Sequence, residues 1–202
     1  MKGLTFVVLS FLAVPLSAIP DLQQSPADGV VQDKSLKPGL VGQYWNFGKE
    51  MNKFPEEFVK AHKPDLCRID GVIDFDSKEE RGFKEGRGGD LPWKDYFAVV
   101  WTGVIRLPME GDYTFYLKSH DSSKLFLNGN LVIDHDGTHP LKETSSKTVH
   151  MKAGDQDLKI EYFHNKGGSC LLSWTYDNVE KQIVPATALW HKFDKEVDRE
   201  AK

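Results

Sequence analysis

The sequence lacks the excess of basic residues that nucleic-acid binding needs. Its 26 lysines and arginines are outnumbered by 30 aspartates and glutamates, and the formal net charge at pH 7 is -4. Phosphate contacts depend on clustered lysine and arginine side chains, so nucleic acid is not an expected partner. With 40% hydrophobic and 11% aromatic residues, the chain still has enough apolar material for a packed core.

The signatures of common catalytic sites are also missing. The sequence contains neither G-x-S-x-G nor H-E-x-x-H, and its cysteines stand in no catalytic context. Acidic residues are abundant, but a chain with 28% charged residues carries them on its surface by default. We therefore predict that the protein is not an enzyme.

Cysteine is scarce, and its two copies are Cys67 and Cys170. In an exported protein an even pair suggests one disulfide between them. The alternative is two separate buried thiols, because cysteine behaves as a small apolar residue in protein cores. The sequence favours the disulfide slightly and leaves both readings open.

The chain has one long apolar run, at its N-terminus. Lys2 precedes the eleven residues Leu4–Val14, and Pro15–Ala18 ends on a small residue suited to cleavage. A membrane anchor is the alternative, but a span needs roughly 20 apolar residues. We therefore predict that residues 1–18 form a signal peptide, that the mature chain is secreted, and that it has no transmembrane segment.

The residues after the signal divide into a linker and one domain. Residues 19–38 contain three prolines and no aromatic residue, which predicts a linker. A single domain is expected over residues 39–190. Leu189, Phe193 and Val197 have helical spacing near the end of the chain, where a short amphipathic helix and a frayed tail fit equally well. Residues 191–202 are assigned to a charged C-terminal tail.

The pattern of the predicted domain is that of β-strands. The segment Tyr96–Leu107 is apolar nearly throughout, as in a strand covered on both faces, and the apolar residues of Tyr113–Leu117 then alternate with others. Asn128–Gly129 is a strong signal for a tight hairpin turn. Strands recur at roughly 8–12-residue spacing with turn residues between them. We predict an all-β fold, an antiparallel β-sandwich.

Five phrases of this sequence also occur, in this order, in one known family. They are Phe97–Gly103, Gly111–Phe115, Ser119–Leu125, Asn128–Asp134 and Lys159–Phe163. In them the chain resembles the protective-antigen-type domain, named for anthrax-toxin protective antigen and shared with the lectin domains of yeast flocculins and adhesins. The resemblance covers three quarters of the chain. It implies a β-sandwich and, in many relatives, carbohydrate binding.

The resemblance also implies a calcium site. In the lectin members, two neighbouring aspartates joined by a cis peptide hold calcium, and an asparagine from a second loop completes the site. The paired acids fall on His120 and Asp121 of this chain, and the asparagine falls on Asn165. His120 departs from the pattern, and because calcium prefers oxygen ligands, an imidazole there weakens the expected site. Calcium remains the implied cofactor, with Asp121 and Asn165 as its ligands.

A second cluster of metal-ligand residues lies between Asp134 and His139. Together with His120–Asp121 it suggests a zinc site as an alternative, because imidazole and carboxylate suit zinc. The usual role of aspartate and histidine on a loop is to face water, and this reading is the weaker one.

The leading interpretation is a secreted recognition module that binds a glycan or another cell-surface ligand through its loops. The predicted ligand-binding residues are His120, Asp121, Asp134, Asp136, Asn165, Lys166 and Gly167. The alternative is a metal-free structural or protein–protein interaction module of the same fold, a reading that His120 favours.

Overall fold

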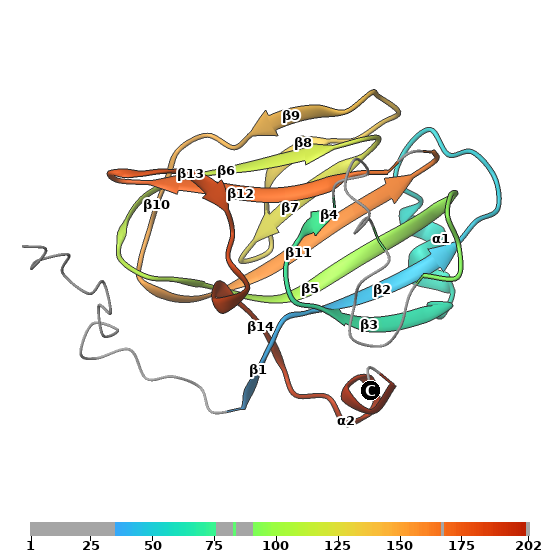
Figure 1. Ribbon diagram of the computed structural model, residues 1–202, viewed down its shortest axis with the longest axis horizontal. Helices are drawn as coiled ribbons and strands as arrows, with labels where there is room; N and C mark the ends of the chain where they lie inside the picture. The colour runs from blue at the N-terminus through green and yellow to red at the C-terminus, as the bar shows by residue number, and fades with distance from the viewer. Residues whose placement is uncertain (1–34, 76–82, 84–90, 167, 201–202) are drawn as a thin grey trace, which may run out of the picture.

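The computed structural model describes residues 35–75, 83, 91–166 and 168–200. The described residues form two antiparallel β-sheets that pack face to face (Figure 1). The predicted all-β sandwich is therefore confirmed. The predicted signal peptide, residues 1–18, and residues 19–34 of the predicted linker lie outside the described residues.

The first sheet contains β5 and β11, the longest strands among the described residues. Its order is β1-β14-β5-β11-β7-β8, and β2 pairs with β5 on one side and with β3 on the other. The strands are β1 (Leu36–Pro38), β2 (Leu40–Asn46), β3 (Leu66–Asp70), β5 (Phe97–Leu107), β7 (Ser123–Leu127), β8 (Asn130–His135), β11 (Gly154–His164) and β14 (Leu189–Lys192).

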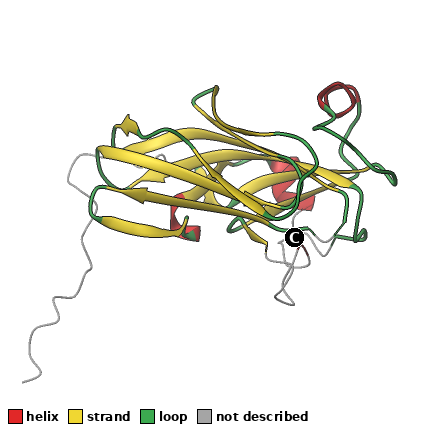
Figure 2. Ribbon diagram, turned by 90° about the horizontal axis from the view of Figure 1, so that it is seen from above, coloured by secondary structure: helices red, strands yellow, loops and turns green. Residues whose placement is uncertain are grey.

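The second sheet has the order β10-β6-β12-β13, with β4 paired to β12 and β9 paired to β6. Its strands are β4 (Asp74–Phe75), β6 (Gly111–Ser119), β9 (Lys142–Ser145), β10 (Val149–Met151), β12 (Cys170–Tyr176) and β13 (Val179–Ile183). Figure 2 shows the two layers from above, with short helices beside long strands.

The strand patterns of the sequence match the packing of the core. Tyr113, Phe115 and Leu117 alternate along β6 and are fully buried, as period-two alternation requires. Trp101 on β5 and Trp174 on β12 fill the space between the sheets. Asn128 and Gly129 connect β7 to β8 with φ angles of 49° and 78°, the paired positive values of a tight hairpin turn.

The helices are short and lie at the margins of the sheets. α1 (Glu56–Ala61) connects β2 to β3, and the 3-10 helix η2 (Ala186–Ala188) precedes β14. α2 (Lys195–Glu200) lies against β3 near the end of the chain (Figure 1). This element confirms the C-terminal helix, but the helical spacing does not extend back to Leu189, which is fully buried and pairs with Ile105 of β5.

The first and the last of the described strands along the chain, β1 and β14, pair with each other. Leu36 of β1 pairs with Lys192 of β14, so the first sheet includes residues that the sequence assigns to the linker and to the tail. Local sequence patterns could not predict this pairing, because the paired residues are separated by most of the chain.

The predicted disulfide is not present: within the described residues, Cys67 and Cys170 are not bonded to each other. Cys67 lies on β3 of the first sheet, opposite Gln43 of β2. Cys170 begins β12 of the second sheet, between Phe75 of β4 and Ser119 of β6. Burial raises the pKa of the Cys170 thiol, so it is held as an unreactive apolar group in the core.

Candidate functional site

Four loops meet at one end of the sandwich, where β6, β8 and β11 end and α1 begins. They connect β6 to β7, β8 to β9, β11 to β12, and β2 to α1. Hydrogen bonds between the loops bring most of the predicted site residues together. Gly167 lies outside the described residues.

Asp121 is at the centre of this loop cluster. It is 1% exposed and has a φ of 63°, in the left-handed region that few side chains adopt. Its backbone N–H donates to the carbonyl of His139 (3.0 Å). Oδ2 accepts the backbone N–H of Asn165 at 2.9 Å and lies 3.3 Å from Nδ1 of His120. Oδ1 is buried and has no hydrogen-bond partner among the described residues.

His120 and His164 approach Asp121 from two loops. One potential ligand atom from each of these three residues lies within 4.8 Å of the other two. The His120 side chain is 32% exposed, whereas His164 is 1% exposed at the end of β11. Burial lowers the pKa of His164 below its ordinary value of 6.5, so this imidazole is neutral at pH 7.

The two nitrogens of His164 have different surroundings. Nε2 donates to the carbonyl of Lys94 (3.2 Å) and lies 3.4 Å from Oδ1 of Asp95. Nδ1 is buried, with no partner among the described residues. Gly168 lies against the face of the ring, since a Cβ added to it would come 2.7–2.8 Å from Nδ1, Cε1 and Cγ.

The side chain of Asn165 is occupied within the protein. Its Oδ1 accepts the backbone N–H of Met51, and its Nδ2 donates to the carbonyl of the same residue, each at 2.9 Å. The structure thus places Asn165 next to Asp121, as the resemblance implied, but the amide oxygen is directed to Met51.

Asp136 is a second connecting residue. Its Oδ1 accepts the backbone N–H of Phe54 at 2.9 Å and the hydroxyl of Ser122 at 2.6 Å. Its Oδ2 forms an ion pair with Nζ of Lys124 at 3.1 Å. Burial alone would raise the pKa of Asp136, but the bonds from Ser122 and Phe54 and the charge of Lys124 lower it. The carboxylate is therefore charged and engaged within the protein.

The other predicted residues lie farther out. Oδ1 of Asp134 accepts the backbone N–H of Asp136 (3.2 Å), and Nζ of Lys166 lies 5.6 Å from the ring centre of Tyr96. The alternative zinc cluster is not assembled as predicted. Among the described residues, the group with metal-ligand spacing consists of His120, Asp121 and His164, and it includes no residue from 134–139. His135 and His139 instead stack on each other with ring centres 3.8 Å apart.

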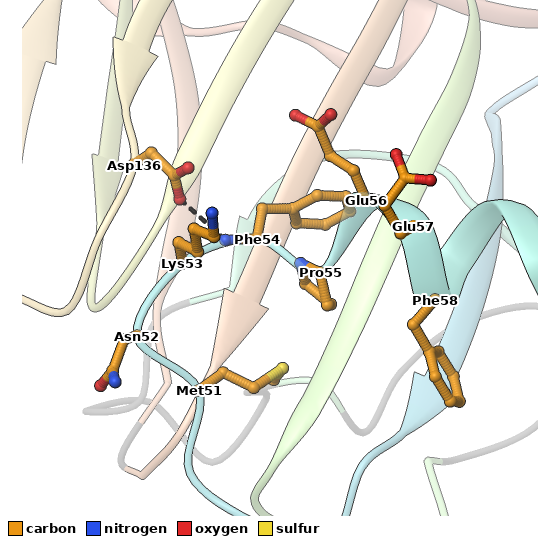
Figure 3. A pocket seen from close by; sticks show the side chains of 9 residues that line it. All are labelled: Met51, Asn52, Lys53, Phe54, Pro55, Glu56, Glu57, Phe58 and Asp136. Atoms are coloured by element: carbon orange, nitrogen blue, oxygen red, sulfur yellow. Dashed lines mark hydrogen bonds between the residues drawn. The ribbon is translucent and has the colours of Figure 1, made fainter.

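A pocket of about 610 Å³ opens beside these loops (Figure 3). It is lined by the continuous segment Met51–Phe58 and by Asp136. Two contacts already described, Asn165 to Met51 and Asp136 to Phe54, hold its wall against the sandwich. The sequence carries no signal for this pocket, because α1 has only six residues and its flanks have no periodic pattern.

The fold defines the class of the protein: it is an antiparallel β-sandwich with potential metal-ligand side chains on the loops at one end. The PA14 domain family model matches residues 36–188, and the chain belongs to that family. The resemblance noted in the sequence is thereby confirmed. Within the described residues, no helix is both long and apolar enough to cross a membrane.

The chain is similar to the anti-sigma-I factor RsgI3 of Acetivibrio thermocellus, with 32% identity over 154 residues. That match covers 75% of this chain but 21% of the relative. A solved anti-sigma factor domain-containing protein is 29% identical, with a TM-score of 0.60 over 78% of this chain and 48% of its own. The PA14 sugar-binding domain of an RTX adhesin shares the fold at 17% identity, with a TM-score of 0.61 over 76% of this chain and 98% of that domain.

The residues at the family's metal position do not fit calcium. Calcium takes six to eight oxygen ligands. Here Asp121 offers one carboxylate, His120 supplies nitrogen where an acid is expected, and the Asn165 oxygen is bonded to Met51. The His120–Asp121 peptide bond is trans.

Proposed function

We propose that this chain is a non-catalytic recognition module that binds a neutral carbohydrate in the pocket between Met51–Phe58 and Asp136, without calcium. The observation that carries the proposal is the mixed character of this pocket. The apolar side chains of Phe54, Pro55 and Phe58 line this pocket together with the acidic side chains of Glu56 and Glu57 (Figure 3).

Both kinds of group suit a sugar. Phe58 is 37% exposed; one face of its ring stacks on His62, with ring centres 3.8 Å apart, and its exposed part offers an apolar surface to the C–H face of a pyranose. The Glu57 side chain is 92% exposed; its Oε1 accepts a hydrogen bond from Nζ of Lys60 at 3.2 Å, and a carboxylate has further capacity to accept hydrogen bonds from sugar hydroxyl groups. Glu56 is paired with Lys124 at 3.1 Å and keeps its charge, since the hydrogen bond from Lys124 and its charge lower the pKa of Glu56. The lining carries the carboxylates of Glu56, Glu57 and Asp136 against one lysine, Lys53, and this excess of negative charge favours a neutral sugar over an acidic one.

The pocket is also pre-formed, which favours binding because little order has to be created. Hydrogen bonds from Met51 to Asn165 and from Phe54 to Asp136 fix its wall to the loops that follow β11 and β8. The pocket is therefore a loop site on a rigid scaffold. Among solved PA14 domains, one from an RTX adhesin is described as sugar-binding. The proposed location outside the cell rests on the apolar N-terminal run and stays a prediction.

The test is a glycan array probed with the folded chain in the presence of EDTA and again with calcium. We expect neutral glycans to bind equally in both conditions. Phe58→Ala and Glu57→Gln should each weaken binding to a positive glycan about tenfold, a loss of about 1.4 kcal/mol. Phe193→Ala removes another exposed phenylalanine, 54% exposed and far from the pocket in sequence, and should bind as the wild type does.

The alternative, a metal-free interaction module for another protein, is supported by one observation. The polar side chains of Asn165 and Asp136 are occupied by contacts within the chain rather than being available to a ligand. An array that stays blank in both conditions, with protein of confirmed fold, would reject the carbohydrate proposal and leave this alternative.

A further inference from the structure

The donor atoms around Asp121 suit a different metal from the one the family resemblance implies. His120, Asp121 and His164 come from the ends of β6 and β11, and one ligand atom of each lies within 4.8 Å of the others. Ligand distances of about 2.0–2.2 Å place the donor atoms around a zinc ion roughly 3–4 Å apart. The spacing of His120 Nδ1 and Asp121 Oδ2, 3.3 Å, already lies in that range.

Two members of this cluster have buried polar atoms without partners. Oδ1 of Asp121 and Nδ1 of His164 make no hydrogen bond with any described residue, and each residue is 1% exposed. Buried polar atoms in folded proteins nearly always have a partner. Two such atoms in one cluster of metal-ligand residues point to a ligand that satisfies both.

The contacts of His164 prepare its ring to be a ligand. Nε2 faces the carbonyl of Lys94, which can only accept, so this nitrogen carries the proton and Nδ1 carries the free lone pair. Oδ1 of Asp95, 3.4 Å from Nε2, adds a carboxylate behind the ring. An outer carbonyl or carboxylate on the second nitrogen is the usual arrangement of metal-binding histidines.

Gly168 lets the backbone pack against the face of the His164 ring. A Cβ at this position would lie 2.7–2.8 Å from Nδ1, Cε1 and Cγ of His164, which places it over the plane of the ring. A side chain at residue 168 would therefore displace the ring and its Nδ1 from the cluster, and Gly168→Ala tests this consequence.

We propose that His120, Asp121 and His164 bind a divalent transition-metal ion of the zinc class. Two imidazoles and one carboxylate are a preferred donor set for zinc and a poor one for calcium. Three protein ligands leave a coordination position open, and His120, with 32% of its side chain exposed, places that position towards solvent. This inference is independent of the carbohydrate pocket.

Titration calorimetry of the chelator-treated full chain with Zn²⁺ tests the proposal, and Co²⁺ serves as an absorbing probe. We expect one tight site per chain and the visible absorption of a low-coordinate Co²⁺ ion. His120→Ala removes a half-exposed ligand at little cost to folding and should weaken Zn²⁺ binding by at least about tenfold. Gly168→Ala should weaken it as well, because the added Cβ would displace the His164 ring from the cluster.

His150→Ala is the matched control. His150 also stands between two carboxylates, with Nδ1 2.9 Å from Asp112 and Nε2 3.3 Å from Glu110, but its side chain is 64% exposed. The control should leave the tight site unchanged. The proposal is overturned if the folded wild type binds no Zn²⁺, if His120→Ala binds as tightly as the wild type, or if His150→Ala loses the site. It is also overturned if millimolar calcium raises the melting temperature while zinc does not.

Discussion

The side-chain amide of Asn165 forms two hydrogen bonds with the backbone of Met51, a residue 114 positions earlier in the chain. The backbone N–H of Asn165 meanwhile donates to Asp121. One residue, directly after the end of β11, therefore connects the wall of the proposed carbohydrate pocket to the proposed metal cluster. The two sites are separate, but they share this support.

Asn165→Ala should release the segment that leads from Met51 into α1. Two partly buried hydrogen bonds are lost, and we expect the free energy of unfolding to fall by about 1–3 kcal/mol. Urea denaturation measures this loss, and hydrogen exchange should quicken at the amides of Met51 and Phe54. Asn52→Ala, an exposed asparagine in the same segment, should change stability by less than about 0.5 kcal/mol. Equal losses for both variants would contradict the role assigned to Asn165.

Stability should depend on pH through His135. Burial, and then the charges of His139 and Lys142, lower the pKa of His135 from 6.5 to about 4. Between these values the unfolded chain binds a proton that the folded chain does not bind, so the free energy of unfolding falls as pH falls from 6.5 to about 4. His135→Gln should flatten this dependence in urea unfolding measured across that window.

His150 provides a control with the opposite sign. Its hydrogen bonds to Asp112 and then Glu110 raise its pKa, so the stability it contributes is present at pH below 6.5 and disappears as pH rises through the folded-state pKa. His150→Gln should therefore leave the slope between pH 6.5 and about 4 unchanged and remove the loss of stability that His150 adds as pH rises above 6.5. Identical profiles above pH 6.5 for His150→Gln and the wild type would contradict the assignment.

The buried bond between Trp101 and Asp70 should contribute measurably to stability. The indole N–H donates to Oδ2 of Asp70 at 2.7 Å, and both residues are almost fully buried. Trp101→Phe leaves that carboxylate with one donor fewer, and we expect a loss of about 1–3 kcal/mol in thermal or urea unfolding. Trp190→Phe removes an indole bond to the carbonyl of Thr187 at the surface, and should cost under about 1 kcal/mol.

Gly103 on β5 should tolerate no side chain. A Cβ there would overlap the carbonyl oxygen of Trp190 on β14 and the side chain of Leu40 on β2. Gly103→Ala should therefore lower the free energy of unfolding by about 1–3 kcal/mol, as overpacking does in other cores. Gly71→Ala is the control, because an added Cβ meets nothing within 4 Å there. If both variants unfold at the same denaturant concentration, the contact between β14 and β5 is not as close as described.

Much of the fold could be predicted because its signals are local. Tyr113, Phe115 and Leu117 alternate with the period of a half-covered strand, and Asn128–Gly129 has the backbone freedom that a tight hairpin needs. The loops that carry Asp121, Asp136 and Asn165 were also located, since they lie between such strands. The roles of these side chains were not predicted, because each role depends on a partner far along the chain.

The sequence by itself determined the all-β class, the family and the loops on which polar residues gather, since these follow from neighbouring residues and from phrases in a known order. Only the tertiary structure decided that β1 pairs with β14, that Cys67 and Cys170 lie in different sheets, and that His164 joins His120 and Asp121. These are contacts between distant segments, and no local pattern encodes them. Packing of the whole core selects them, because burying one face of every strand leaves few ways to bring the loops together.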